Sequence, residues 1–72
     1  MIIKYIDCNG RHITVEGACH IIYDSIDDCA IFKPLLAEGS LIIRCDEDPD
    51  NNFKCATAKV YMNKIKGGLT VI

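Results

Sequence analysis

Two cysteines and two histidines lie within the first twenty residues: Cys8, His12, Cys19 and His20. Two thiolates and two imidazoles are a common tetrahedral ligand set for zinc, but the spacing lacks paired Cys-x-x-Cys knuckles. If Asn9-Gly10 is a two-residue hairpin turn, Asp7 pairs with His12, and Cys8 then lies on the opposite face. We therefore expect no metal site and no cofactor here, and we expect structural roles for the histidines.

The same register brings three residue types of a cysteine hydrolase near one another. Asp7 lies beside His12, and Cys19 lies diagonally across on a third strand. A catalytic cysteine also needs its histidine within hydrogen-bond reach and a donor pair for the developing oxyanion. No loop or helix start beside Cys19 offers that pair. We expect the protein not to be an enzyme and keep a cysteine-dependent hydrolase only as a third hypothesis.

An acidic segment carries four carboxylates: Asp46, Glu47, Asp48 and Asp50. Their alternation resembles a calcium loop, but that loop needs glycine at its sixth position and a bidentate glutamate at its twelfth, which here are Asn51 and Thr57. A solvated turn is the usual structure of such a segment. Clustered carboxylates can also imitate phosphates for a basic protein. The segment is therefore a candidate partner-binding site.

Three polar residues alternate near the C-terminus: Lys59, Tyr61 and Asn63. In a strand they share one face, opposite Ala58, Val60 and Met62. Lysine supplies charge to a phosphate, tyrosine a stacking plane, and asparagine a donor and an acceptor for a base edge. These three residues are the candidate ligand-binding site for an anionic, nucleotide-like molecule. A solvated strand face or an interface between copies is the alternative.

Charge is divided unevenly along the chain. Residues 1–50 contain all ten acidic residues and four basic ones, whereas residues 51–72 contain four lysines and no acid. This pattern predicts a local surface for an anion or an acidic neighbour, and no general binding to nucleic acid or membrane. No apolar stretch approaches the length of a membrane span, and no basic recognition helix or phosphate-binding glycine loop is present.

The elements that must position these residues are mostly strands. Alternating segments on either side of Asn9-Gly10 predict a hairpin, and Glu16-Gly17 predicts a second turn into residues 18–24, which together give a three-stranded meander. Ser25, with Asp28 three residues later, resembles a capping box, so a short helix near residues 25–33 is expected, and Pro34 limits its length. Residues 41–45 alternate as a half-buried strand.

Residues 54–66 fit two structures. As a strand, Ala58, Val60 and Met62 share a face, and Gly67-Gly68 turns the chain into a last strand at 69–72. As a helix, Ala58, Tyr61, Met62 and Ile65 form a stripe that Gly67 ends. The β-branched residues favour the strand. We predict one domain over residues 1–72 that is β-rich, an all-β small barrel or sandwich-like meander, with α+β and a helix at 54–66 as the alternative.

Size and composition predict association. A chain of 72 residues buries only about 60% of the surface that its unfolded form exposes, and half of its residues are apolar. With an apolar end at Thr70-Val71-Ile72, this predicts a homo-oligomer. Five cysteines without a signal peptide indicate a reduced, cytoplasmic protein.

These observations favour a small non-catalytic binding protein. The first hypothesis is an inhibitor of a protein partner, and the size class alone extends it to a viral or mobile-element protein. The alternative is an oligomeric sponge that sequesters an anionic nucleotide-like small molecule.

Overall fold

The computed structural model describes all residues from 1 to 72 and consists of strands joined by short turns. The strands are β1 (Ile2–Asp7), β2 (His12–Glu16), β3 (Cys19–Asp24), β4 (Cys29–Pro34), β5 (Leu41–Cys45), β6 (Asp48–Cys55), β7 (Ala58–Tyr61) and β8 (Ile65–Val71). The 3-10 turn η1 (Met62–Lys64) joins β7 to β8, and no helix is long and apolar enough to cross a membrane. The predicted β-rich class is confirmed.

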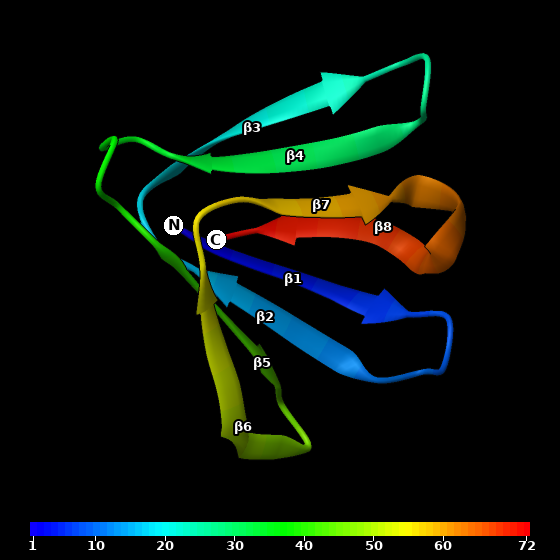
Figure 1. Cartoon of the computed structure of the whole chain (residues 1–72). Coiled ribbons are helices and arrows are strands. Elements are labelled where there is room, and N and C mark those ends of the chain that lie inside the picture. The colour runs from blue at the N-terminus through cyan, green and yellow to red at the C-terminus, as the bar shows by residue number, and fades with distance from the viewer.

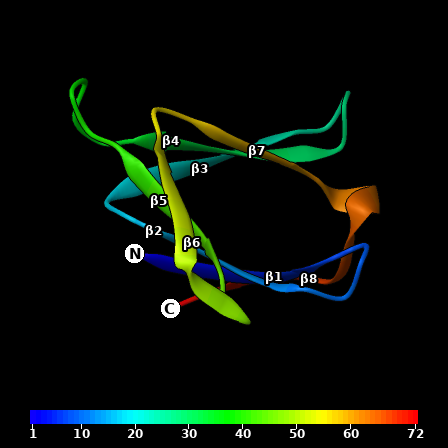
Figure 2. The same ribbon diagram turned by 60° about the horizontal axis from the view of Figure 1, so that its bottom comes forward.

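The strands form two antiparallel sheets. One has the order β6-β5-β2-β1-β8 and the other the order β3-β4-β7. Figure 2 shows them as two layers, with β3, β4 and β7 above β1, β2 and β8, and with β5 and β6 rising between the layers (Figures 1 and 2). The sandwich-like arrangement follows from strands that are apolar on one face and must bury it against a second sheet.

The core lies between the inner faces of the two sheets. Ile3 and Val15 pair across β1 and β2, while Phe32 and Ala58 pair across β4 and β7. These four side chains are at most 8% exposed, and Phe32 is the largest that is fully buried. The alternation of buried and exposed residues that a period of two requires is clear in β7, where Ala58 and Val60 are buried and Lys59 and Tyr61 are exposed.

The first hairpin is confirmed, but its register differs from the prediction by one residue. Ile6 pairs with His12, so the loop is Cys8-Asn9-Gly10 and Asp7 does not face His12. The N–H of Gly10 donates to the carbonyl of Asp7 (3.0 Å), and Gly10 has φ +80°. A turn followed by a residue with positive φ is the usual form of a three-residue hairpin loop.

Gly10→Val is expected to lower the free energy of unfolding by about 1 kcal/mol or more, because a β-branched residue is strained at positive φ. No atom lies within 4 Å of the Cβ position, so the cost comes from the backbone alone. Thermal unfolding measures it. Gly10→Asn is the control and should lose less, since asparagine tolerates this conformation. Equal stability of the parent and the valine variant would contradict the turn.

The predicted three-stranded meander is wrong. After Gly17 the chain leaves the larger sheet, and β3 pairs with β4 in the other layer, while β5 takes the place beside β2. A Cβ on Gly17 would lie 3.0 Å from Cδ2 of Leu41, and its φ is +150°. Glycine is therefore needed here because two chain segments cross closely. In the sequence, such a glycine looks the same as the glycine of a hairpin turn.

The predicted short helix near residues 25–33 is also absent. One carboxylate oxygen of Asp24 accepts hydrogen bonds from the backbone N–H of Ile26 (2.9 Å) and of Asp27 (3.3 Å). Asp28 has φ +51°, which ends any helical path. The segment is a turn between β3 and β4, because the apolar residues from Cys29 to Phe32 are needed as a core strand.

The strand interpretation of residues 54–66 is confirmed for β7, and the helical alternative at 54–66 is wrong. The strand is interrupted by η1, so Asn63 lies outside it. Gly67-Gly68 is not a turn but lies within β8. Lys66 pairs with Ile6 and Thr70 pairs with Lys4, so three residues of β8 oppose Tyr5 alone. Both glycines have φ +77°, and the extra residues form a bulge.

Candidate functional site

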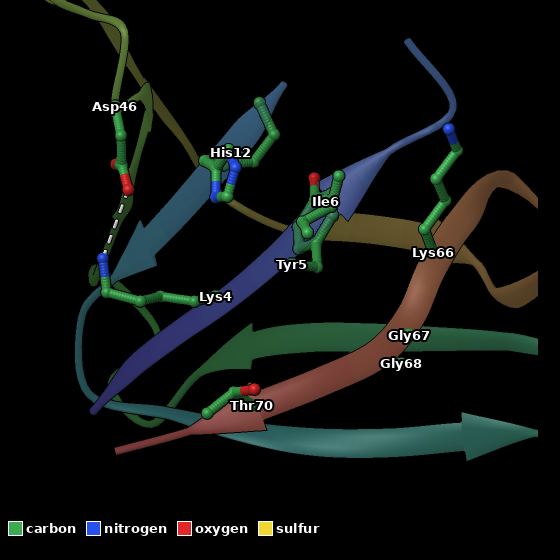
Figure 3. A pocket seen from close by; sticks show the side chains of 10 residues that line it. Lys4, Tyr5, Ile6, His12, Asp46, Lys66, Gly67, Gly68 and Thr70 are labelled. Carbon is green, nitrogen blue, oxygen red and sulfur yellow. Dashed lines mark hydrogen bonds and ion pairs between the residues drawn. The ribbon is translucent and has the colours of Figure 1, made fainter. Parts of the chain in front are cut away.

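The bulge in β8 borders a hollow on the outer face of the larger sheet. Its volume is about 260 Å³. Figure 3 shows Lys4 and Asp46 on one side, Lys66 and the bulge on the other, and His12 with Ile6 between them (Figure 3). Thr70 completes the rim. The hollow is therefore lined by two ammonium groups, a hydroxyl and the backbone of two glycines, with the apolar side chain of Ile6 between them.

Strand alternation explains why these side chains share a face. Ile3 and Val15 point into the core, so Lys4 with its partner Thr14, and Ile6 with its partner His12, point outward. Pairing of β8 with β1 then adds Lys66 beside Ile6. Residues from the two ends of the chain thus come together on one surface.

Lys4 is held at the rim by a polar network. Its ammonium donates to Oγ1 of Thr14 (3.0 Å) and lies 3.3 Å from Oδ2 of Asp46. The Thr14 hydroxyl, whose residue is 0% exposed, donates to Oδ1 of Asp46 (2.6 Å). The Thr14 hydrogen bond and then Lys4 hold the pKa of Asp46 below its ordinary value. The charge of Lys4 is therefore positioned and partly balanced.

Lys66 has no such balance, because its ammonium forms no ion pair. Two lysines against one carboxylate leave the hollow with a net positive charge. No atom lies within 4 Å of a Cβ position at Gly67 or Gly68, so the backbone there is open to an approaching group. Lysines and exposed backbone N–H groups are the usual ligands of phosphate oxygens.

The predicted ligand residues lie elsewhere. Lys59 and Tyr61 share the outer face of β7, with the Lys59 ammonium 5.3 Å from the ring centroid and 3.9 Å from Oδ2 of Asp27. The interaction with Tyr61 raises the pKa of Lys59. Asn63 does not continue this face, because it lies in η1. Lys59 and Tyr61 therefore form a pair outside the hollow, and the Lys59 ammonium already interacts with Tyr61 and Asp27.

The acidic segment is divided between two roles. Asp46 joins the Thr14 network, and the Glu47 carboxylate accepts from the backbone N–H of His12 (3.2 Å) and from Sγ of Cys45 (3.1 Å). The Cys45 hydrogen bond lowers the pKa of Glu47 and raises the pKa of Cys45. Asp48 and Asp50 lie exposed on the edge strand β6 and form no ion pair.

The residues considered for zinc or for cysteine catalysis are not brought together as the register argument required. Cys19 lies in the other sheet and donates to Sδ of Met1 (3.7 Å). The Asp7 carboxylate binds Nε and the backbone N–H of Arg11, both at 2.9 Å, which holds its pKa below the ordinary value. No group of three or more His, Cys, Asp or Glu side chains is placed to hold a metal ion.

Lys4, Lys66 and Thr70 were missed as a site by sequence reasoning. The available signal was Gly67-Gly68 inside an alternating segment, which can mark a bulge as well as a turn. No protein-family model matches the chain, and no curated protein or solved structure is significantly similar to it. The fold and the hollow together define a small two-layered antiparallel β protein with a basic surface site.

Proposed function

We propose that this protein is a small non-catalytic binding protein that holds a phosphate-bearing small molecule in the Lys4–Lys66 hollow. The observation that carries the proposal is that two lysines line one hollow beside the open backbone of Gly67-Gly68. This function keeps the anionic ligand expected from the basic C-terminal segment but assigns it to different residues. All five cysteines are free, which fits a protein of the reducing cytoplasm.

The size of the hollow limits how the ligand binds. At about 260 Å³ it lies just below the usual range for small-molecule pockets, about 300–1,000 Å³. We place the phosphate group at Lys66 and the Gly67-Gly68 backbone, and the remainder of a nucleotide would extend over Ile6 and His12 toward Lys4 (Figure 3). Because the lysine heads are exposed, the affinity should fall as salt is added.

Lys66→Ala is expected to weaken binding of pyrophosphate or AMP about five- to twentyfold at low salt, because one charged hydrogen bond is lost. Isothermal titration calorimetry measures this change. Lys54→Ala is the matched control, since Lys54 lies on β6 of the same sheet but does not line the hollow. Equal losses in the two variants, or no binding to the parent at millimolar ligand, would refute the proposed site.

A protein partner is the second candidate function, and one observation favours it. The edge strand β6 carries Asp48, Asp50 and a Phe53 side chain that is 58% exposed. Carboxylates and an exposed aromatic ring fit a basic surface of another protein, as an inhibitor would require. In that case Asp48→Asn with Asp50→Asn slows capture of the partner, whereas Lys66→Ala does not.

A further inference from the structure

Each sheet has two edges, and three of the four edge strands contain features that oppose pairing with another chain. β6 begins Asp48-Pro49-Asp50, β8 carries Lys66 and the Gly67-Gly68 bulge, and β7 has only four residues, with Lys59 among them. Proline, bulges, lysine and short length are the devices by which natural sheets protect their edges. β3 has none of them.

β3 is instead a regular and apolar edge. Its six residues pair with β4 without a register shift, and its outer side is free in Figure 1, where it is the outermost strand of its sheet (Figure 1). Ile21 is 37% exposed, Ile22 44% and Tyr23 59%. These residues lie on both faces of the strand, so a further strand beside β3 would cover all three.

The exposure of Ile21 and Tyr23 is informative because they lie on the core face. Their cross-strand partners on β4 are Phe32 and Ala30, which are 0% and 2% exposed. The core face of this sheet is therefore covered at β4 but not at β3. A monomer would leave this apolar margin in water at a cost proportional to its area.

We propose that β3 pairs antiparallel with β3 of a second copy, around a twofold axis at Ile22. In this register Ile22 faces Ile22 of the second copy, and Ile21 faces Tyr23. His20 faces Asp24, and the twofold axis repeats that pair at the other end of the strand. Each residue from His20 to Asp24 has a complementary partner on its own face.

The charges select this register over its two neighbours. Residues that pair directly must lie on the same face, so the adjacent twofold registers are centred on Ile21 and on Tyr23. In the first, His20 faces Ile22 and Asp24 lies beyond the paired segment. In the second, Asp24 faces Ile22 and His20 lies beyond it. The Ile22 register alone matches an imidazole with a carboxylate and apolar residues with one another. This self-complementarity identifies the occupant as a second copy of the chain.

The dimer has a continuous sheet of β7, β4 and β3 from each copy. The Lys4–Lys66 hollow lies on the outer face of the other sheet and stays open. Dimerisation through β3 is therefore independent of the proposed ligand site, and an experiment can refute either one without refuting the other.

Ile22→Lys tests the axis, because it places two ammonium groups opposite each other where the parent has apolar contact. Sedimentation velocity at high micromolar concentration is expected to give a dimer for the parent and a monomer for this variant. The control is Ile72→Lys, which changes a 70% exposed isoleucine at the apolar C-terminus and should stay dimeric. A monomeric parent, or a dimer lost in Ile72→Lys but kept in Ile22→Lys, overturns the proposal.

A second pair of variants tests the register and remains informative if Ile22→Lys fails to fold. His20→Asp opposes two carboxylates and is expected to weaken the dimer about tenfold, whereas His20→Lys keeps the attraction to Asp24 and should leave the dimer intact. The dimerisation constants come from sedimentation equilibrium. Equal constants for these two variants would show that His20 does not face Asp24 and would overturn the register.

Discussion

Phe32→Ala is expected to lower the free energy of unfolding by about 3–5 kcal/mol. Phe32 is the largest fully buried side chain and belongs to the core cluster between the two sheets. A domain of this length has a total stability of about 4–10 kcal/mol. The variant should therefore be unfolded or close to unfolding at room temperature. Urea denaturation followed by circular dichroism measures the loss.

Phe53→Ala is the matched control, because the chain has two phenylalanines and the second is 58% exposed. Its removal is expected to cost less than about 1 kcal/mol, as for most surface substitutions. The ratio of the two losses tests where the core lies. If Phe53→Ala destabilised the protein as much as Phe32→Ala, the assignment of inner and outer faces would be wrong.

The sequence predicted what local signals determine. The turn at Gly10, the strand at residues 41–45 and the strand at β7 all follow from turn residues and from a period of two within short segments. The capping-box pattern at Ser25 misled, because the same small polar residues that begin helices also stabilise turns. In the structure Asp24, one residue earlier, takes that role and begins a tight connection.

Strand pairing was not predictable in the same way. Local sequence patterns do not predict that β5 pairs with β2, because this pairing depends on which strand arrangement buries Leu41 and Phe32 together. A shift of one residue in the first hairpin also altered the argument about His12. Such errors are small in sequence but move side chains to the other face of a strand.

The candidate site was hidden for the same reason. Lys4 and Lys66 lie near opposite ends of the chain, and only the pairing of β1 with β8 joins them. Local reasoning could place Lys59 with Tyr61, which are two residues apart on one strand. It could not place two distant lysines on one face, since no pattern within a segment encodes a long-range register.

Asp46→Asn is expected to change stability and ligand affinity in opposite directions. The buried Thr14 hydroxyl loses its ionised acceptor, which should lower the free energy of unfolding by about 1–2 kcal/mol. The hollow also loses its one carboxylate, which should tighten binding of pyrophosphate by about threefold at low salt, because a repulsive exposed charge is removed. Urea denaturation and calorimetry measure the two quantities. A variant that bound pyrophosphate more weakly would show that Asp46 acts only by positioning Lys4.

Asp46→Asn also measures how much of the loss of stability at low pH is caused by protonation of Asp46. The pKa of Asp46 is lowered in the folded protein from an ordinary value of 3.8, by the Thr14 hydrogen bond first and then by Lys4. In the pH window between the folded and the unfolded pKa of Asp46, the unfolded chain takes up the proton first as the pH falls. The stability of the parent therefore falls in this window and is fully present above it. The asparagine variant binds no such proton, and its stability should change less with pH. The pKa values of Asp7 and Glu47 are lowered in both proteins, so their contributions cancel in the difference. If the two stability curves ran parallel through the window, the hydrogen bond from Thr14 would not favour the ionised carboxylate, and Lys4 would not be anchored at the hollow by a charged partner.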